Sequence, residues 1–177
     1  VISGETVSAS GTCTFADKNV GTGKTVSCSS IALSGTDKGN YSLSSTSASK
    51  TSAANITAKA LTWATKPTVS NKTYNGNTNA TISSNGSISG AVSGDTVTLD
   101  SSSASAKFAD ANVGTNKAIT FTGYALSGTD KGNYTLAQPT GVTANITNAA
   151  NPISVTPKTG LVYSGSDQSL VTVSGAQ

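Results

Sequence analysis

Polar and apolar residues alternate along much of the chain, and this pattern predicts β-strands. In the segment Ile119–Thr122 the two large apolar side chains fall on one face and the two threonines on the other. The same alternation recurs over residues 142–146 and 61–63. No window of about eleven residues shows the 3.6-residue apolar period of an amphipathic helix. The pattern therefore favours an all-β fold.

Residues that favour turns separate these short apolar segments. Asn75-Gly76 and Asn85-Gly86 are typical of tight turns, and residues 93–95 and 130–133 are rich in the same residue types. Strands spaced roughly 8–12 residues apart are typical of sandwiches. We expect tandem antiparallel β repeats, built as Ig-like sandwiches or β-grasp-like layers, with little or no helix. At most, the two Gly-Thr-Asp-Lys-Gly-Asn segments form a single helical turn each.

A long internal repeat is the main feature of the sequence. Residues 15–43 and 108–136 are identical at 19 of 29 positions, at a constant offset of 93. Similar flanks surround both copies: Ile-Ser-Gly-Glu-Thr-Val or Val-Ser-Gly-Asp-Thr-Val before them, and Ala-Asn-Ile-Thr after them. Tyr74-Asn75-Gly76 has a weaker counterpart in Tyr163-Ser164-Gly165. Such self-similarity indicates a tandem architecture.

The repeat divides the chain into three parts. Residues 1–60 are the later two-thirds of a first repeat, residues 61–148 a complete second repeat, and residues 149–177 the opening third of a further one. An incomplete sheet leaves unpaired strand edges, so we expect the flanking parts to pair with neighbouring repeats or with identical subunits end to end.

Two assemblies fit this division. In the first, the chain is a window on a much longer tandem polypeptide. In the second, residues 149–177 of one subunit complete the sheet begun by residues 1–60 of the next, which would build a head-to-tail filament by strand complementation. The second assembly predicts self-association at high concentration.

Composition argues against catalysis and against nucleic-acid binding. Serine and threonine together make up 57 of 177 residues; the chain has no histidine and no arginine, and Glu5 is its only glutamate. The commonest general base and the main residue for bidentate phosphate recognition are therefore missing. The lysines are scattered singly, and no apolar run approaches the roughly 18 residues that span a membrane. We expect no enzyme activity, no cofactor, no nucleic-acid partner and no membrane insertion in this segment.

One string of motifs is specific enough to suggest a family. Lys72-Thr73-Tyr74-Asn75-Gly76 is followed by Gly-Asp-Thr-Val at 94–97, by Phe-Ala-Asp-x-Asn-Val-Gly-Thr, and by Ala-Leu-Ser-Gly-Thr-Asp-Lys-Gly-Asn-Tyr-Thr-Leu. This order resembles the YDG domain, with Asn75 in place of the family's aspartate. Residues 152–177 resemble the start of an MBG-type repeat.

The resemblance implies a place in large bacterial surface or secreted proteins. YDG domains recur in tandem in adhesin-like proteins, so it implies an extracellular or cell-surface stalk or fibre that acts mechanically. The alternative is an adhesion module that binds a glycan, a host protein or a matrix protein. Trp63 and Tyr74 are the aromatic residues that could stack on a sugar, although Trp63 alternates with Leu61 as a core residue would.

Cys13 and Cys28 are the only cysteines. They lie symmetrically about the Asn19–Thr22 turn, so they would face each other across a hairpin, and the second repeat lacks both, with Ala106 and Phe121 instead. Two cysteines in an exported β protein are usually bridged, so we expect a disulfide and an oxidising compartment. The alternative is a pair of buried free thiols.

Four aspartates in turn segments are the candidates for calcium: Asp17, Asp37, Asp110 and Asp130. Each turn carries a single carboxylate, whereas a calcium site takes 6–8 oxygen ligands, so we expect no metal and assign these residues to turn closure. Lysine–asparagine isopeptide bonds would stiffen such a protein, but the sequence identifies no triad for them.

Overall fold

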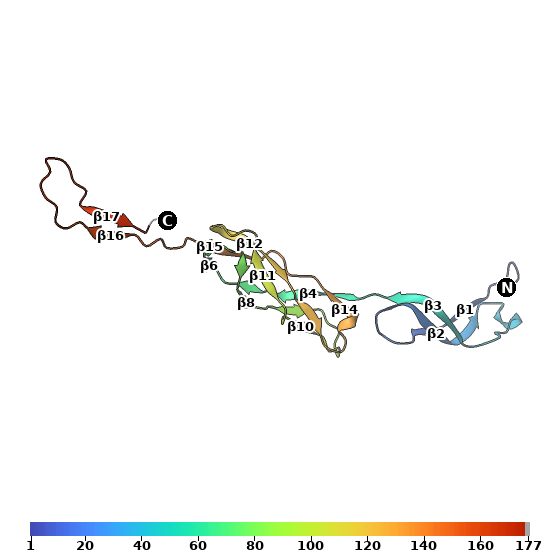
Figure 1. Ribbon diagram of the computed structural model, residues 1–177. Coiled ribbons are helices and arrows are strands. Elements are labelled where there is room, and N and C mark those ends of the chain that lie inside the picture. The colour runs from blue at the N-terminus through green and yellow to red at the C-terminus, as the bar shows by residue number, and fades with distance from the viewer. Residues whose placement is uncertain (176–177) are drawn as a thin grey trace. The chain divides into compact units, whose positions relative to one another are not determined.

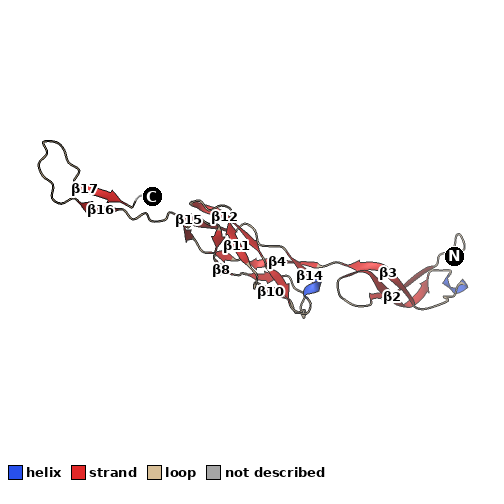
Figure 2. Ribbon diagram, in the orientation of Figure 1, coloured by secondary structure: helices blue, strands red, loops and turns tan. Residues whose placement is uncertain are grey.

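The computed structural model describes residues 1–175, without the side chains of residues 52 and 53. Strands make up nearly all the regular structure of this range, and its helical part is two short 3-10 turns, η1 (Lys38–Asn40) and η2 (Lys131–Asn133) (Figure 2). The all-β fold expected from the alternation is confirmed. Both turns lie in the Gly-Thr-Asp-Lys-Gly-Asn segments, where the sequence allowed one helical turn.

The strands are labelled in chain order in Figure 1. Residues 1–60, the first repeat, contain β1 (Ser8–Phe15), β2 (Gly21–Ser34) and β3 (Ala48–Ile56), and β4 (Lys59–Thr65) begins before that boundary. The second repeat continues with β5 (Thr68–Val69), β6 (Lys72–Thr73), β7 (Asn79–Ala80), β8 (Ile82–Ser84), β9 (Ser87–Ser89), β10 (Thr98–Asp100), β11 (Ser105–Phe108), β12 (Gly114–Thr122), β13 (Ala125–Ser127), β14 (Tyr134–Leu136) and β15 (Thr143–Thr147). After it come β16 (Ser154–Pro157) and β17 (Val171–Ser174).

The chain divides into two compact units, which are described one at a time. The first unit consists of Val1–Lys66, Gly86–Ser103 and Gly123–Gln138, and so combines the first repeat with parts of the second. The second unit consists of Pro67–Asn85, Ala104–Thr122 and the chain from Pro139 onward.

In the first unit, β1, β2 and β3 form an antiparallel sheet with β2 at its centre. The register of β1 and β2 places Cys13 directly opposite Cys28, as the symmetry of the hairpin predicts. Every side chain of β1 and β2 is exposed or half-buried. This sheet therefore gains little stability from apolar burial.

The same unit contains β4 between two partners, β9 in antiparallel and β14 in parallel orientation. Leu61 on β4 is buried, and Trp63, two residues on, lies opposite Ile88 of β9. The Trp63 ring meets Tyr124 edge-on at 5.1 Å, and its Nε1 donates a hydrogen bond of 3.0 Å to the Ala137 carbonyl. Trp63 is thus held by packing and by a hydrogen bond.

The second unit is built on a five-stranded sheet in the order β6-β15-β12-β11-β7. Buried side chains occupy alternate positions on its three central strands: Ala106, Phe108, Ile119, Phe121, Ala144 and Ile146. The alternation predicted over 119–122 and 142–146 is therefore confirmed. Full burial of a large apolar side chain contributes about 1.5–3 kcal/mol, so this apolar layer is the main stabilising element of the sheet.

Within residues 1–175, two strand pairs are parallel, β4 with β14 in the first unit and β6 with β15 in the second. The other pairs are antiparallel, as expected. Side chains alternate in the same way in both kinds of pair, so the sequence pattern could not distinguish the two parallel pairs from the rest.

The two copies of one phenylalanine differ greatly in exposure. Phe108 is 3% exposed, whereas Phe15, its equivalent in the first repeat, is 40% exposed. In the second repeat β7 pairs with β11, and the Lys72 ammonium lies 5.3 Å above the Phe108 ring. Among the described residues of the first repeat, no strand corresponds to β6 or β7.

Beyond the second repeat, β16 and β17 form an antiparallel hairpin with Val155 opposite Val173. Its register resembles that of β4 and β9, where Trp63 lies opposite Ile88. The hairpin and its loop expose large apolar side chains, among them Tyr163 at 94%.

Candidate functional site

Three loops of the first unit meet at one place and form a polar site. They are the loop between β1 and β2, the loop between β9 and β10, and the junction of η2 with β14. The first belongs to the first repeat and the other two to the second. We call this site the inter-repeat joint and define it by Lys18, Val20, Asp95, Asp130 and Asn133.

The β1–β2 loop is shaped by its own side chains. Asp17 accepts a hydrogen bond of 2.8 Å from the Asn19 backbone N–H and pairs with the Lys24 ammonium. Lys24 also donates to the Asn19 carbonyl at 2.7 Å. The contact with Lys24, followed by the bond from Asn19, lowers the pKa of Asp17, so it stays ionised and closes the turn. This turn presents Lys18 to the second repeat.

The receiving surface is built by short hydrogen bonds within the second repeat. The Tyr134 hydroxyl donates to Asp95 Oδ2 at 2.7 Å and accepts the Val92 backbone N–H at 3.0 Å. Asp130 Oδ2 accepts the Thr96 backbone N–H at 2.7 Å. The hydrogen bond to Asp95 raises the pKa of Tyr134, which keeps the hydroxyl protonated as a donor. The two carboxylates are thereby fixed beside each other.

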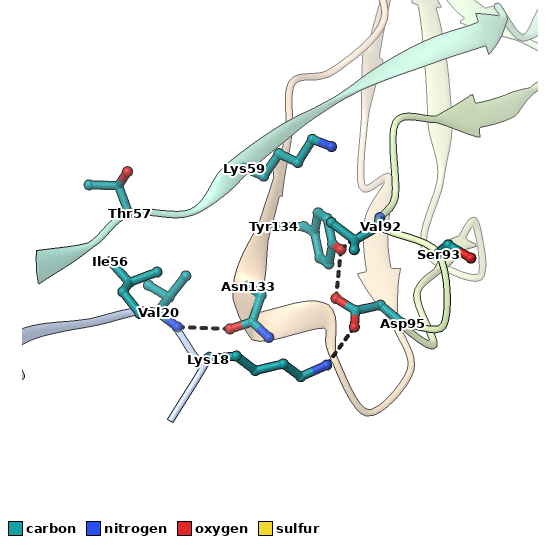
Figure 3. Close-up of a pocket in the computed structure, with 10 residues that line it drawn as sticks. All are labelled: Lys18, Val20, Ile56, Thr57, Lys59, Val92, Ser93, Asp95, Asn133 and Tyr134. Atoms are coloured by element: carbon teal, nitrogen blue, oxygen red, sulfur yellow. Dashed lines mark hydrogen bonds and ion pairs between the residues drawn. The ribbon is translucent and has the colours of Figure 1, made fainter. Parts of the chain in front are cut away.

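Lys18 connects the two repeats by charge. Its Nζ lies 2.6 Å from Asp95 Oδ1 (Figure 3). It also lies 3.6 Å from Asp130 Oδ1. The hydrogen bond to Asp95 raises the pKa of Lys18, and the bonds from Lys18 and then Tyr134 lower the pKa of Asp95. Both groups therefore stay charged at neutral pH. Because the Lys18 side chain is 67% exposed, water and salt screen this pair.

Asn133 completes the joint with two hydrogen bonds. Its Oδ1 accepts the Val20 backbone N–H at 2.9 Å, and its Nδ2 donates to Asn19 Oδ1 at 3.2 Å. These bonds fix the position of the β1–β2 loop more specifically than the ion pair alone. A cavity of about 430 Å3 lies beside them, and Ile56, Val92 and Tyr134 contribute apolar surface to its wall (Figure 3).

A model of the YDG domain matches residues 1–48 and 57–143. The chain belongs to the YDG-domain family. The two matched segments correspond to the two copies of the repeat, so the joint lies between two successive YDG segments. No curated protein and no solved structure showed a significant match to the chain.

The YDG motifs build the same network in both copies. In the first segment the Tyr41 hydroxyl donates to Glu5 and accepts the Ile2 backbone N–H at 2.8 Å, and Asp37 accepts the Thr6 backbone N–H at 2.8 Å. Glu5, Asp37 and Tyr41 thus repeat the roles of Asp95, Asp130 and Tyr134. The similar flanks and the Gly-Thr-Asp-Lys-Gly-Asn-Tyr motif are the parts of the sequence that specify this network.

A glycine before the 3-10 turn is required in both YDG segments. Gly35 and Gly128 have φ of +109° and +103°, a region that other residues rarely adopt. A Cβ at either position would clash with the carbonyl oxygen of Thr6 or Thr96. Because the backbones approach so closely, the aspartate two residues after each glycine, Asp37 or Asp130, reaches the threonine N–H.

Cys13 and Cys28 form the disulfide expected from the sequence. Their equivalents in the second YDG segment, Ala106 and Phe121, also face each other and are both buried. The disulfide of the first segment therefore takes the place of an apolar contact in the second. It lies in the segment whose sheet buries less apolar surface. A covalent link across a hairpin stabilises mainly by restricting the unfolded chain.

Of the four aspartates assigned to turn closure, Asp17 and Asp110 accept a backbone N–H of their own turn, whereas Asp37 and Asp130 accept the N–H of Thr6 and Thr96 from another loop. Asp110 accepts the Asn112 N–H and pairs with Lys117 at 2.6 Å, as Asp17 does with Asn19 and Lys24. No cluster of three potential ligands for a metal occurs within residues 1–175. Asp130 has a further role that the sequence did not reveal, because it lies beside Asp95 at the joint.

The two aromatic candidates for sugar stacking differ in their surroundings. Trp63 is held against Tyr124, whereas Tyr74 is 44% exposed. Over residues 1–175, no helix is long and apolar enough to cross a membrane.

Lys18 and Asn133 were missed by sequence reasoning. In the sequence Lys18 looks like one of the scattered lysines, and the one informative signal is that the aligned residue in the second repeat is Ala111. Asn133 belongs to a motif present in both repeats, and nothing in the motif distinguishes the copy that receives a loop.

Proposed function

We propose that this chain is a structural tandem-repeat module of an extracellular, adhesin-like bacterial stalk or fibre. The observation that carries the proposal is the inter-repeat joint. A stalk needs adjacent domains to hold a defined orientation, and a joint of one ion-paired lysine and two asparagine hydrogen bonds supplies this. The module acts mechanically, with neighbouring repeats as its partners.

Two features support an extracellular location. The Cys13–Cys28 disulfide is typical of oxidising compartments. The MBG-type resemblance of residues 152–177 agrees with a chain of varied extracellular repeats, and it stays a prediction.

Head-to-tail assembly by strand complementation is part of the proposal. In the second repeat, β7 pairs with the outer edge of β11 and β6 with the outer edge of β15. Within the described part of the chain, the equivalent edges in the first repeat, on β1 and β3, have no such strand, and Phe15 on β1 is exposed. A neighbouring repeat, whether of the same polypeptide or of another subunit, would cover them. Residues 149–177, the opening third of a repeat, are the part of this chain that would supply such strands, and their β16–β17 hairpin exposes large apolar side chains.

An adhesion module is the second candidate, favoured by one observation. Tyr74 is 44% exposed and could stack on a sugar ring. Trp63 is the weaker anchor, because its ring packs against Tyr124 and its N–H is already hydrogen-bonded.

A binding screen combined with a mechanical measurement tests the proposal. We expect the full chain to show no saturable binding to glycans or matrix proteins, and to unfold under force in discrete steps. Saturable glycan binding that free sugar competes away and that Tyr74→Ala abolishes would favour the adhesion module. A Trp63→Phe variant is the control, since it keeps an aromatic ring in the packed position.

A further inference from the structure

The receiving surface of the joint occurs twice in the chain. In the second repeat it consists of Asp95, Asp130, Asn133 and Tyr134, and in the first of Glu5, Asp37, Asn40 and Tyr41. The second copy is occupied by the β1–β2 loop, as Figure 3 shows. None of the ion pairs found within residues 1–175 involves Glu5 or Asp37.

The first copy is already folded for docking. Tyr41 holds Glu5, and Asp37 is fixed by the Thr6 N–H and by the Thr36 hydroxyl, as Asp130 is by Thr96 and Thr129. Asn40 Nδ2 lies 3.3 Å from Glu5 Oε1. Because both copies have the same tyrosine and aspartate bonds, this part of the network forms whether or not a loop is docked on it, and only the asparagine amide exchanges its partner, Glu5 in the first copy and Asn19 in the second. Docking would therefore require little rearrangement.

We infer that the surface formed by Glu5, Asp37, Asn40 and Tyr41 binds the β-hairpin loop of another YDG domain, one that carries a lysine at the position of Lys18. The inference rests on the proposed stalk function and names the partner of its second joint. The loop's lysine would pair with Glu5 and Asp37, and Asn40 would accept a backbone N–H from the loop, as Asn133 does from Val20.

The lysine should decide which loops bind. The equivalent loop of the second repeat keeps the turn, with Asp110 bonded to the Asn112 N–H and to Lys117, but has Ala111 at the lysine position. Apart from this difference, the two loops share Asp, Asn and Val at positions 17, 19 and 20. A joint made by residues 110–113 would lack the ion pair, so the two kinds of joint would differ in strength and salt dependence.

The experiment titrates the full, ¹⁵N-labelled chain with a hairpin loop probe. The probe is a synthetic peptide of residues 13–28, closed by its own Cys13–Cys28 disulfide. The matched control is the same peptide with Lys18→Ala. Amide chemical shifts of Thr6 and Asn40 report the predicted surface, and a chain with Glu5→Gln and Asp37→Asn tests the two carboxylates with isosteric changes.

We expect saturable shifts of Thr6 and Asn40, with affinity about two- to fivefold weaker for the alanine peptide, the range of an exposed ion pair. The chain with both substitutions should bind the two peptides equally. Equal binding of both peptides to the unaltered chain, or no shift at Thr6 and Asn40, would overturn the inference.

The same spectra separate this inference from the stalk proposal. In the unaltered chain, the Val20 amide reports the existing joint through its bond to Asn133. If Val20 shows the hydrogen bond but the peptide does not bind, only the inference fails. If Val20 shows no hydrogen bond, the joint itself is absent and the proposed function fails with it.

Discussion

A single substitution between the repeats separates a charged loop from an uncharged one. Lys18 and Ala111 occupy the same place in the same aspartate-closed turn, and Lys18 alone reaches two carboxylates. The hydrogen bonds of Asn133 are made by uncharged groups and hold the same loop, so they and the ion pair support each other. At the scale of residues, the asparagine hydrogen bonds define where the loop docks. The ion pair adds selectivity for a loop that carries a lysine, and it makes docking depend on salt.

Removing the Lys18 charge should loosen the joint without unfolding either repeat. In Lys18→Ala we expect faster hydrogen exchange of the Val20 amide, because its bond to Asn133 opens more often. Lys50→Ala removes the same charge from an exposed strand of the same repeat and serves as control. Unchanged exchange at Val20 in Lys18→Ala would mean that the ion pair plays no part.

The joint should open in acid. The contacts with Lys18 and Tyr134 hold the pKa of Asp95 below 3.8, so this stabilisation is present above pH 3.8 and is lost as pH falls through the lowered value. The raised pKa of Lys18 preserves the pair up to at least pH 10.5. The Val20 amide shift should therefore be constant from pH 5 to pH 9. A transition centred above pH 5 would contradict this assignment.

Gly128 should tolerate no side chain, unlike its neighbour Gly132. Gly128→Ala places a Cβ against the Thr96 carbonyl at a φ of +103°, which should cost about 1–3 kcal/mol of unfolding free energy. Gly132→Ala meets nothing within 4 Å and should cost less than about 1 kcal/mol. Urea denaturation followed by Trp63 fluorescence compares the two, and equal costs would contradict the steric account.

At the scale of elements, local pattern predicted more than pairing did. Alternation identified β12 and β15, and the turn residues identified η2, because both depend on neighbours in sequence. The parallel partners of β4 and β6 could not be predicted, since strand order depends on contacts between residues more than 70 positions apart, such as Thr73 with Thr147. The spacing of the cysteines did fix one pairing, that of β1 with β2.

The two equivalent phenylalanines should differ in their contribution to stability. Phe108→Ala removes a ring that is 3% exposed and should cost about 3–5 kcal/mol. Phe15→Ala removes one that is 40% exposed and should cost less than about 2 kcal/mol. Amide exchange in β11 and β12 should accelerate strongly in Phe108→Ala, and exchange in β1 and β2 should accelerate only slightly in Phe15→Ala. A large loss of stability in the monomeric chain with Phe15→Ala would contradict this, because it would show that the Phe15 ring is covered.

The disulfide should stabilise the first repeat alone. Replacing both cysteines with serine should cost that repeat about 3 kcal/mol, the value expected for a closed loop of this size, with a sequence separation of 15. Amide exchange in β1 and β2 measures the loss, and exchange in β11 and β12 is the internal control. Equal losses in both hairpins would contradict a local effect.

At the scale of the whole molecule, the site was harder to predict than the fold. The repeat and its motifs indicated two YDG segments, and the network of Asp95, Asp130 and Tyr134 lies within those motifs. The joint depends in addition on which loop of one repeat reaches the other. That is a property of the two-residue connection between β3 and β4 and of the docked loop, and neither leaves a pattern in the sequence.

Residual dipolar couplings test the central claim most directly, because they report whether the two repeats keep one orientation at the joint. Couplings would be measured in the full chain for amides of residues 8–34 and for those of residues 86–100 and 125–136, all within the first unit. We predict that one alignment tensor fits both sets, and that Lys18→Ala combined with Asn133→Ala requires two. Two independent tensors in the unaltered chain would contradict a structural joint between YDG repeats.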